Sequence, residues 1–108
     1  MVANGVIEPV RSAGFGPPLG VDPNADYRGV TVPLHPGDLV VLYTDGVTDA
    51  LNGDFEPFGE DRLRKALSSS PPEAEASGKA IMAAVNEFAR GPTQYDDITI
   101  VCFGRDAV

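Results

Sequence analysis

Acidic side chains adjoin apolar, strand-like segments at two places in the chain. Asp45 and Asp49 come directly after the apolar run of residues 38–44, and the pair Asp96 and Asp97 comes directly before the apolar run that ends at residue 104. Carboxylate oxygens are the ligands that Mg²⁺ and Mn²⁺ prefer, whereas a zinc site usually needs several Cys and His residues. Two such ions close together can polarise a phosphoryl group for hydrolysis. The residue types therefore favour a carboxylate site for divalent cations.

The spacing allows the two acidic segments to meet. If the two apolar runs are neighbouring antiparallel strands, the end of the first and the start of the second lie at the same edge of the sheet. Clustered carboxylates repel one another, so a site that gathers them usually contains a cation or raises a pKa. However, Asp-Gly is also a common turn and paired Asp a common strand cap. From spacing alone, both the metal-site and the purely structural interpretation remain open.

The segments around these acids predict an α+β domain. Residues 27–34 and 38–44 read as the strands of a hairpin, because Pro36 and Gly37 suit the turn between them. Residues 97–104 read as a further strand. Residues 1–26 are rich in Gly and Pro and are expected to be mostly loop. Their run GFGPPLGVDP lacks a G-x-G-x-x-G pattern and favours a tight turn over a phosphate-binding loop.

Two consecutive helices are predicted between the strands. Residues 58–70 place Leu63, Ala66 and Leu67 on one face. For the second helix, Ser70 is predicted as the N-cap, with Pro at the first helical position and Glu73 completing a capping box. The apolar repeat then continues to residue 88, and Gly-Pro at 91–92 ends it. Because the helices follow one another, an α+β layered sandwich is favoured over parallel βαβ units.

Composition excludes several classes of partner. The 108 residues carry a net charge of -8, so nucleic acid and anionic membrane surfaces are disfavoured as partners. No apolar run is long enough to cross a bilayer, and the N-terminus does not resemble a signal peptide, so a cytoplasmic location is expected. The single cysteine, Cys102, lies in an apolar run, where core burial is more common than reactivity.

Three segments together match a known protein family in order and spacing. GDLVVLYTDGVTDALN (residues 37–52), FGEDRL (58–63) and YDDITIVCF (95–103) resemble the C-terminal half of the SpoIIE-like branch of the PPM (PP2C-type) serine/threonine phosphatases. GPPLGV at 16–21 and the Pro-Gly-Asp turn at 36–38 are similar to that family as well. The resemblance covers almost the whole chain.

The resemblance implies a partial αββα sandwich, with antiparallel sheets, flanking helices and two Mn²⁺ or Mg²⁺ ions at one end. It implies that Asp45 and Asp96 are catalytic residues that bind metal, and Gly46 adjoins the first of them. Asp97 is expected to order its turn more than to bind metal. Asp49 matches a position that in some relatives helps to hold a third, weaker ion, or it is simply an acid early in a helix.

The resemblance also implies a substrate and an incomplete catalytic site. The implied substrate is a phosphoprotein, often a phosphorylated anti-sigma-factor antagonist. Relatives carry further metal-binding acids in an N-terminal half that residues 1–108 do not contain. We therefore expect a partial domain that is weak or inactive alone, with an apolar face that the missing half or self-association covers. The alternatives are a non-catalytic, phosphatase-like regulatory binding module and an α+β domain whose acidic turns are structural.

Overall fold

The apolar segment before Asp45 and the one after Asp97 pair directly with each other. The computed structural model describes residues 1–3, 5–10, 20–26, 29–90 and 97–106. Within them the sheet has the order β2-β1-β3-β4, and all its pairings are antiparallel. Its strands are β1 (Val2–Ala3), β2 (Val6–Ile7), β3 (Leu39–Tyr43) and β4 (Ile100–Gly104). The helices are α1 (Asp45–Thr48), α2 (Gly59–Ser68) and α3 (Ala74–Phe88). The predicted α+β class is confirmed.

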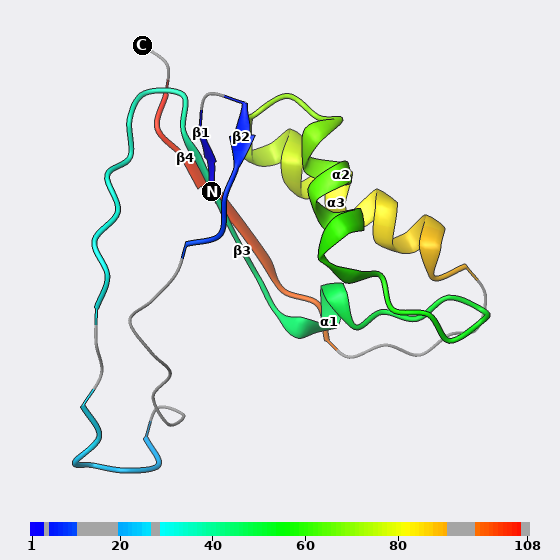
Figure 1. Ribbon diagram of the computed structural model, residues 1–108, viewed down its shortest axis with the longest axis horizontal. Helices are drawn as coiled ribbons and strands as arrows, with labels where there is room; N and C mark the ends of the chain where they lie inside the picture. Colours follow the sequence, from blue (N-terminus) through cyan, green and yellow to red (C-terminus); the bar gives the residue numbers. More distant parts are fainter. Residues whose placement is uncertain (4, 11–19, 27–28, 91–96, 107–108) are drawn as a thin grey trace.

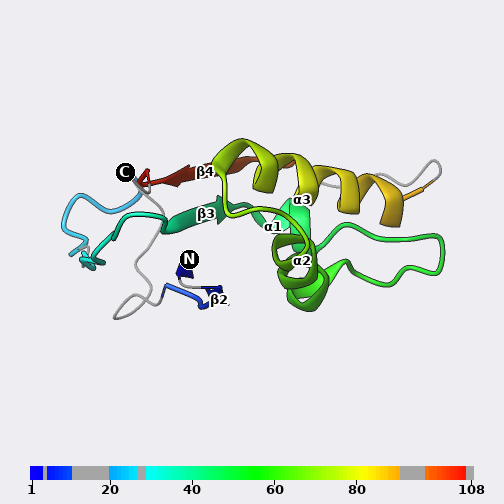
Figure 2. The ribbon, with the colours of Figure 1, turned by 90° about the horizontal axis from the view of Figure 1, so that it is seen from above.

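The helices cover one face of the sheet. Figure 1 shows the sheet nearly edge-on with α2 and α3 on one side of it, and Figure 2 shows the two helices side by side. Among the described residues, no helix is long and apolar enough to cross a membrane. The molecule is a flat slab of 43 × 42 × 18 Å.

Apolar side chains from the helices and the loop before α2 form the core. Phe58, Ile81 and Val85 are almost completely buried, and the ring of Phe58 meets that of Phe88 edge to face, with 5.5 Å between centroids. The strands contribute Val41 and Ile100 to this cluster. The other buried members are Val47, Ala50, Leu63 and Leu67. The apolar face predicted for α2 is therefore confirmed as core.

The register of β3 and β4 divides their side chains between two faces. Val41 lies opposite Cys102, on the face that α2 and α3 cover. Because successive side chains in a strand point to opposite faces, Leu42 and its partner Val101 lie on the other face. Cys102 is half-buried, and burial raises the pKa of its thiol, which disfavours the reactive thiolate at neutral pH.

The predicted hairpin is wrong in its first strand. Residues 29–35 form no strand, and β3 pairs with β1 instead. Pro33 lacks the N–H that a ladder needs, so this stretch is a poor strand. The turn itself is confirmed: Gly37 has a φ of +88°, and the N–H of Asp38 donates to the carbonyl of His35 at 3.0 Å.

The predicted start of the second helix is also wrong. Helix α3 begins at Ala74, and the residue before it, Glu73, is extended and makes no side-chain cap. A residue that precedes a proline is disfavoured in the helical conformation, which applies to Pro71 because Pro72 follows it. Ser70 serves the preceding helix instead, since its hydroxyl donates to the carbonyl of Leu67 at 3.2 Å.

Candidate metal centre

The antiparallel pairing brings the two acidic segments to the same end of the sheet. Tyr43 lies opposite Ile100, so Asp45 follows the last pair on one strand and Asp97 precedes it on the other. The juxtaposition predicted from the sequence is confirmed for these two segments. Asp96 lies outside the described residues.

Thr44 joins the two segments with three hydrogen bonds. Its N–H donates to the carbonyl of Thr99 at 3.1 Å. Its hydroxyl donates to the carbonyl of Asp97 at 3.2 Å and accepts the N–H of Thr99 at 3.1 Å. The sequence analysis missed this residue. The signal for it was the presence of Thr beside each acidic segment, at positions that antiparallel pairing brings together.

Asp45 occupies the first position of the short helix α1, not a turn. Thr44 before it is extended, and its carbonyl accepts the N–H of Val47 at 3.0 Å. Gly46 and Val47 are buried and anchor the helix, while the Asp45 side of it is exposed to solvent. Asp45 is therefore placed with its carboxylate open to solvent.

Asp49 ends the same helix. It is the C-cap residue, and its N–H donates to the carbonyl of Asp45 at 2.8 Å. Residues four apart lie on the same side of a helix, so Asp49 adds negative charge on the side of α1 that bears Asp45. Gly46 has no positive φ. It belongs to the helix and does not provide the left-handed turn that an Asp-Gly pair often forms.

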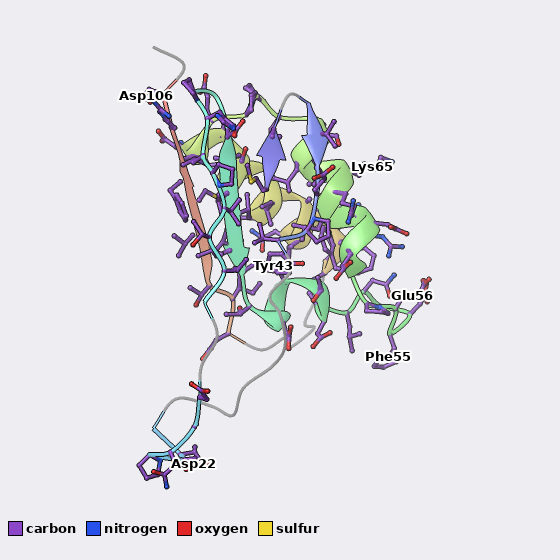
Figure 3. The ribbon with its side chains drawn as sticks, turned by 60° about the vertical axis from the view of Figure 1, so that its left-hand side comes forward. Asp22, Tyr43, Phe55, Glu56, Lys65 and Asp106 are labelled. Atoms are coloured by element: carbon purple, nitrogen blue, oxygen red, sulfur yellow. The ribbon has the colours of Figure 1, made fainter. Side chains whose placement is uncertain are left out.

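Tyr43, the last residue of β3, has charged side chains around its phenol. Burial raises the pKa of the Tyr43 phenol, and the carboxylates of Glu60 and Asp45 raise it further, while Arg64 opposes them. Tyr43 lies at the lower end of β3 in Figure 3. The raised pKa keeps the Tyr43 phenol protonated at neutral pH.

The exposed oxygen donors at this end of the sheet are of the type that a hard divalent cation prefers. Asp45, Asp49 and Asp97 are exposed and offer carboxylate oxygens. Over the ranges that the structure describes, no group of three or more His, Cys, Asp or Glu side chains is close enough to hold a metal ion. The described residues therefore do not by themselves make a metal site.

Comparison with known proteins identifies relatives of this chain. The model of the family "Stage II sporulation protein E (SpoIIE)" matches residues 3–106. Protein IcfG of Synechocystis sp. (strain ATCC 27184 / PCC 6803 / Kazusa) is 32% identical over 96 residues, which are 89% of this chain and 15% of IcfG. No solved structure matches. The resemblance found in the sequence is therefore confirmed, and the chain belongs to the SpoIIE family.

Proposed function

We propose that residues 1–108 form the C-terminal part of a metal-dependent serine/threonine protein phosphatase, folded as a partial αββα sandwich of the PP2C-like type. The observation that carries the proposal is the pairing of β3 with β4, in which Thr44 joins the backbone beside Asp45 to that of Asp97. Membership of the SpoIIE family supports the same function.

Asp45 and Asp96 are the proposed metal-binding catalytic residues. Mn²⁺ or Mg²⁺, when bound, polarises a phosphoryl oxygen and lowers the pKa of its bound water. Asp45 offers a carboxylate from the first turn of α1, and Asp97 orders the turn before β4 through its carbonyl. Gly46 keeps the first turn of α1 small and buried, and Asp49 contributes a weaker, secondary charge. Thr44 holds both segments in register for this task.

The proposed substrate is a protein that carries phosphoserine or phosphothreonine. A phosphorylated anti-sigma-factor antagonist is the specific candidate, because the matching family is named after a sporulation protein and phosphatases of this branch often act on such antagonists. The chain spans 15% of IcfG, so further metal ligands are expected from the rest of a phosphatase domain. Residues 1–108 alone are therefore expected to be weak or inactive.

The test is a titration of the chain with Mn²⁺, followed by calorimetry and by the midpoint of thermal unfolding. The carboxylates of the site should bind Mn²⁺ weakly and raise the midpoint, because a ligand that binds only the folded state stabilises it. We expect Asp45→Ala and Asp96→Ala each to reduce the affinity for Mn²⁺ about tenfold or more, as loss of a charged ligand does.

Asp106→Ala is the matched control, because Asp106 is also an exposed aspartate but lies beyond the opposite end of β4. It should leave the affinity for Mn²⁺ unchanged. An Asp45→Ala chain that binds Mn²⁺ as tightly as the parent contradicts the metal site. Binding of a phosphoprotein without hydrolysis, even when the rest of a phosphatase domain is supplied, identifies instead the alternative function, a non-catalytic regulatory binding module.

A further inference from the structure

The loop between α1 and α2, residues 50–58, is closed firmly at its base. Leu51 and Pro57 form an antiparallel bridge, and the N–H of Phe58 donates to the carbonyl of Ala50 at 2.7 Å. The guanidinium of Arg62 donates to the carbonyls of Pro57 and Phe58 at 3.0 and 3.1 Å. It also lies 4.4 Å from the centroid of the Phe88 ring, in a cation–π contact with the core. The base of the loop is thus attached to the helical layer.

Asn52 organises the tip of the same loop. Its side-chain oxygen accepts the N–H groups of Asp54 and Glu56, both at 2.9 Å. Its amide nitrogen donates to the Glu56 carboxylate at 3.2 Å, and its carbonyl accepts the N–H of Phe55 at 3.1 Å. A single side chain that accepts or donates three hydrogen bonds holds the tip in one conformation. The hydrogen bonds of Asn52 therefore give the loop a defined conformation.

This ordered tip displays an aromatic ring at an energetic cost. Phe55 has a φ of 60°, a left-handed conformation that costs a bulky residue roughly 1–2 kcal/mol. Its side chain is 80% exposed and points away from the body of the molecule (Figure 3). The hydrogen bonds of the loop hold this backbone conformation, while the ring itself stays open to solvent. Exposed aromatic side chains held rigidly are the usual anchors of protein interfaces.

The position and charge of the loop point to one class of partner. The loop starts directly after Asp49, so it borders the helix that carries the candidate metal ligand Asp45. The neighbours of Phe55 in the chain, Asp54 and Glu56, are both exposed. A surface that receives this tip needs an apolar pocket for the ring and basic side chains around it.

We propose that the Phe55 loop is a docking contact for the phosphoprotein substrate, whose surface offers an apolar pocket rimmed by Lys or Arg. The inference rests on the proposed function. The substrate is the proposed partner because the loop directly follows α1, which carries the proposed metal ligand Asp45. Docking at the loop holds the substrate protein beside α1, so that its phosphorylated residue can reach the end of β3 and β4. The loop contains none of the proposed metal ligands.

The test measures the dissociation constant of a phosphorylated anti-sigma-factor antagonist from the chain by calorimetry. Phe55→Ala should weaken binding about tenfold or more, which is the effect of truncating an interface anchor. Phe55→Asn should weaken it similarly yet fold at least as stably as the parent, because Asn tolerates a positive φ. Loss of binding without loss of stability separates docking from a structural role. Phe55→Leu, which keeps apolar bulk, should retain part of the affinity.

Val21→Ala is the matched control, since Val21 is another highly exposed apolar residue, 70% accessible, outside the loop. Binding by Phe55→Ala and Phe55→Asn within about twofold of the parent, well short of an anchor's effect, overturns the docking role and leaves the proposed function standing. If the parent chain neither binds the phosphorylated antagonist nor responds to Mn²⁺, the proposed function fails and the docking role fails with it.

Discussion

Thr44 shows how one hydroxyl can determine the geometry of a carboxylate site. The paired residues of β3 and β4 end at Tyr43 and Ile100, and Thr44 extends the connection through both its backbone N–H and its hydroxyl. The side chains of Asp45 and Asp97 are exposed, and the backbone carbonyl of Asp97 accepts the Thr44 hydroxyl. The hydroxyl is therefore one of the contacts that set the position of Asp97 relative to Asp45.

Thr44→Val tests that role, because valine keeps the β-branched shape and removes only the hydroxyl. We expect the free energy of unfolding to fall by about 1 kcal/mol, the usual net value of such hydrogen bonds. We also expect weaker binding of Mn²⁺, because the segment of Asp97 loses its attachment beside Asp45. Urea unfolding and metal calorimetry measure the two effects.

The matched control for this prediction is Thr99→Val. Thr99 bonds to Thr44 through its backbone N–H and carbonyl, which the substitution retains. The control should therefore keep both its stability and its affinity for Mn²⁺. Equal effects of the two substitutions would assign the change to the loss of any hydroxyl near the site and not to the connection that Thr44 makes.

At the scale of elements, the helices and strands that could be predicted are those with a sustained apolar pattern in the sequence. Helices α2 and α3 and strands β3 and β4 each carry a sustained apolar pattern, and all four are found close to their predicted ranges. β1 and β2, with two residues each, are too short to show a period. The hairpin was wrong because the choice of a strand's partner depends on distant residues, which local turn signals cannot reveal.

In the candidate site, too, some features could be predicted from the sequence and others could not. The meeting of the Asp45 and Asp97 segments followed from antiparallel pairing and could be predicted. The bonds of Thr44 were missed: a Thr lies beside each acidic segment, but their pairing depends on register to within one residue. The roles of Asp45, Asp96, Asp97, Asp49 and Gly46 as metal-site residues stay predictions. Phe55 carried no sequence signal, because its exposure and positive φ arise only from the folded loop.

Replacing a glycine by alanine should have opposite effects on stability in β4 and in α3. A Cβ on Gly104 would lie 2.6 Å from the backbone oxygen of Asp38, and backbone at the end of β3 cannot move away easily. Gly104→Ala should destabilise the chain by about 1–3 kcal/mol, as overpacking does.

A Cβ on Gly78, inside α3, would meet only the sulfur of Cys102 at an ordinary 3.7 Å. Gly78→Ala should stabilise it by about 0.5–1 kcal/mol, since Ala favours the helix.

Urea unfolding of both glycine variants measures these free energies, and each variant serves as the control for the other. A Gly104→Ala chain as stable as the parent would mean that β3 and β4 approach less closely at this end than the structure indicates. Their register, on which the candidate site depends, would then need revision.

At the scale of the whole molecule, none of the described helices covers the second face of the sheet. Leu42, Val101 and Phe103 lie on the face opposite the helices and are 54%, 48% and 46% exposed. In Figure 1 the chain before β3 runs along this side of the sheet, but it leaves these side chains accessible. Contiguous apolar surface of this kind marks an interface in a soluble protein.

The uncovered face predicts that residues 1–108 associate with one another when no other part of a phosphatase domain covers it. The sedimentation coefficient should rise with protein concentration, because burial of apolar area between two such faces is favourable. Leu42→Lys should suppress the rise, since a lysine placed in the face would have to be desolvated in the interface. Val21→Lys adds the same charge at an exposed site away from the sheet and should leave the rise unchanged. A parent chain that sediments as a monomer at every concentration would mean that this face does not drive association, whereas suppression by Leu42→Lys alone would locate the interface on the outer side of β3.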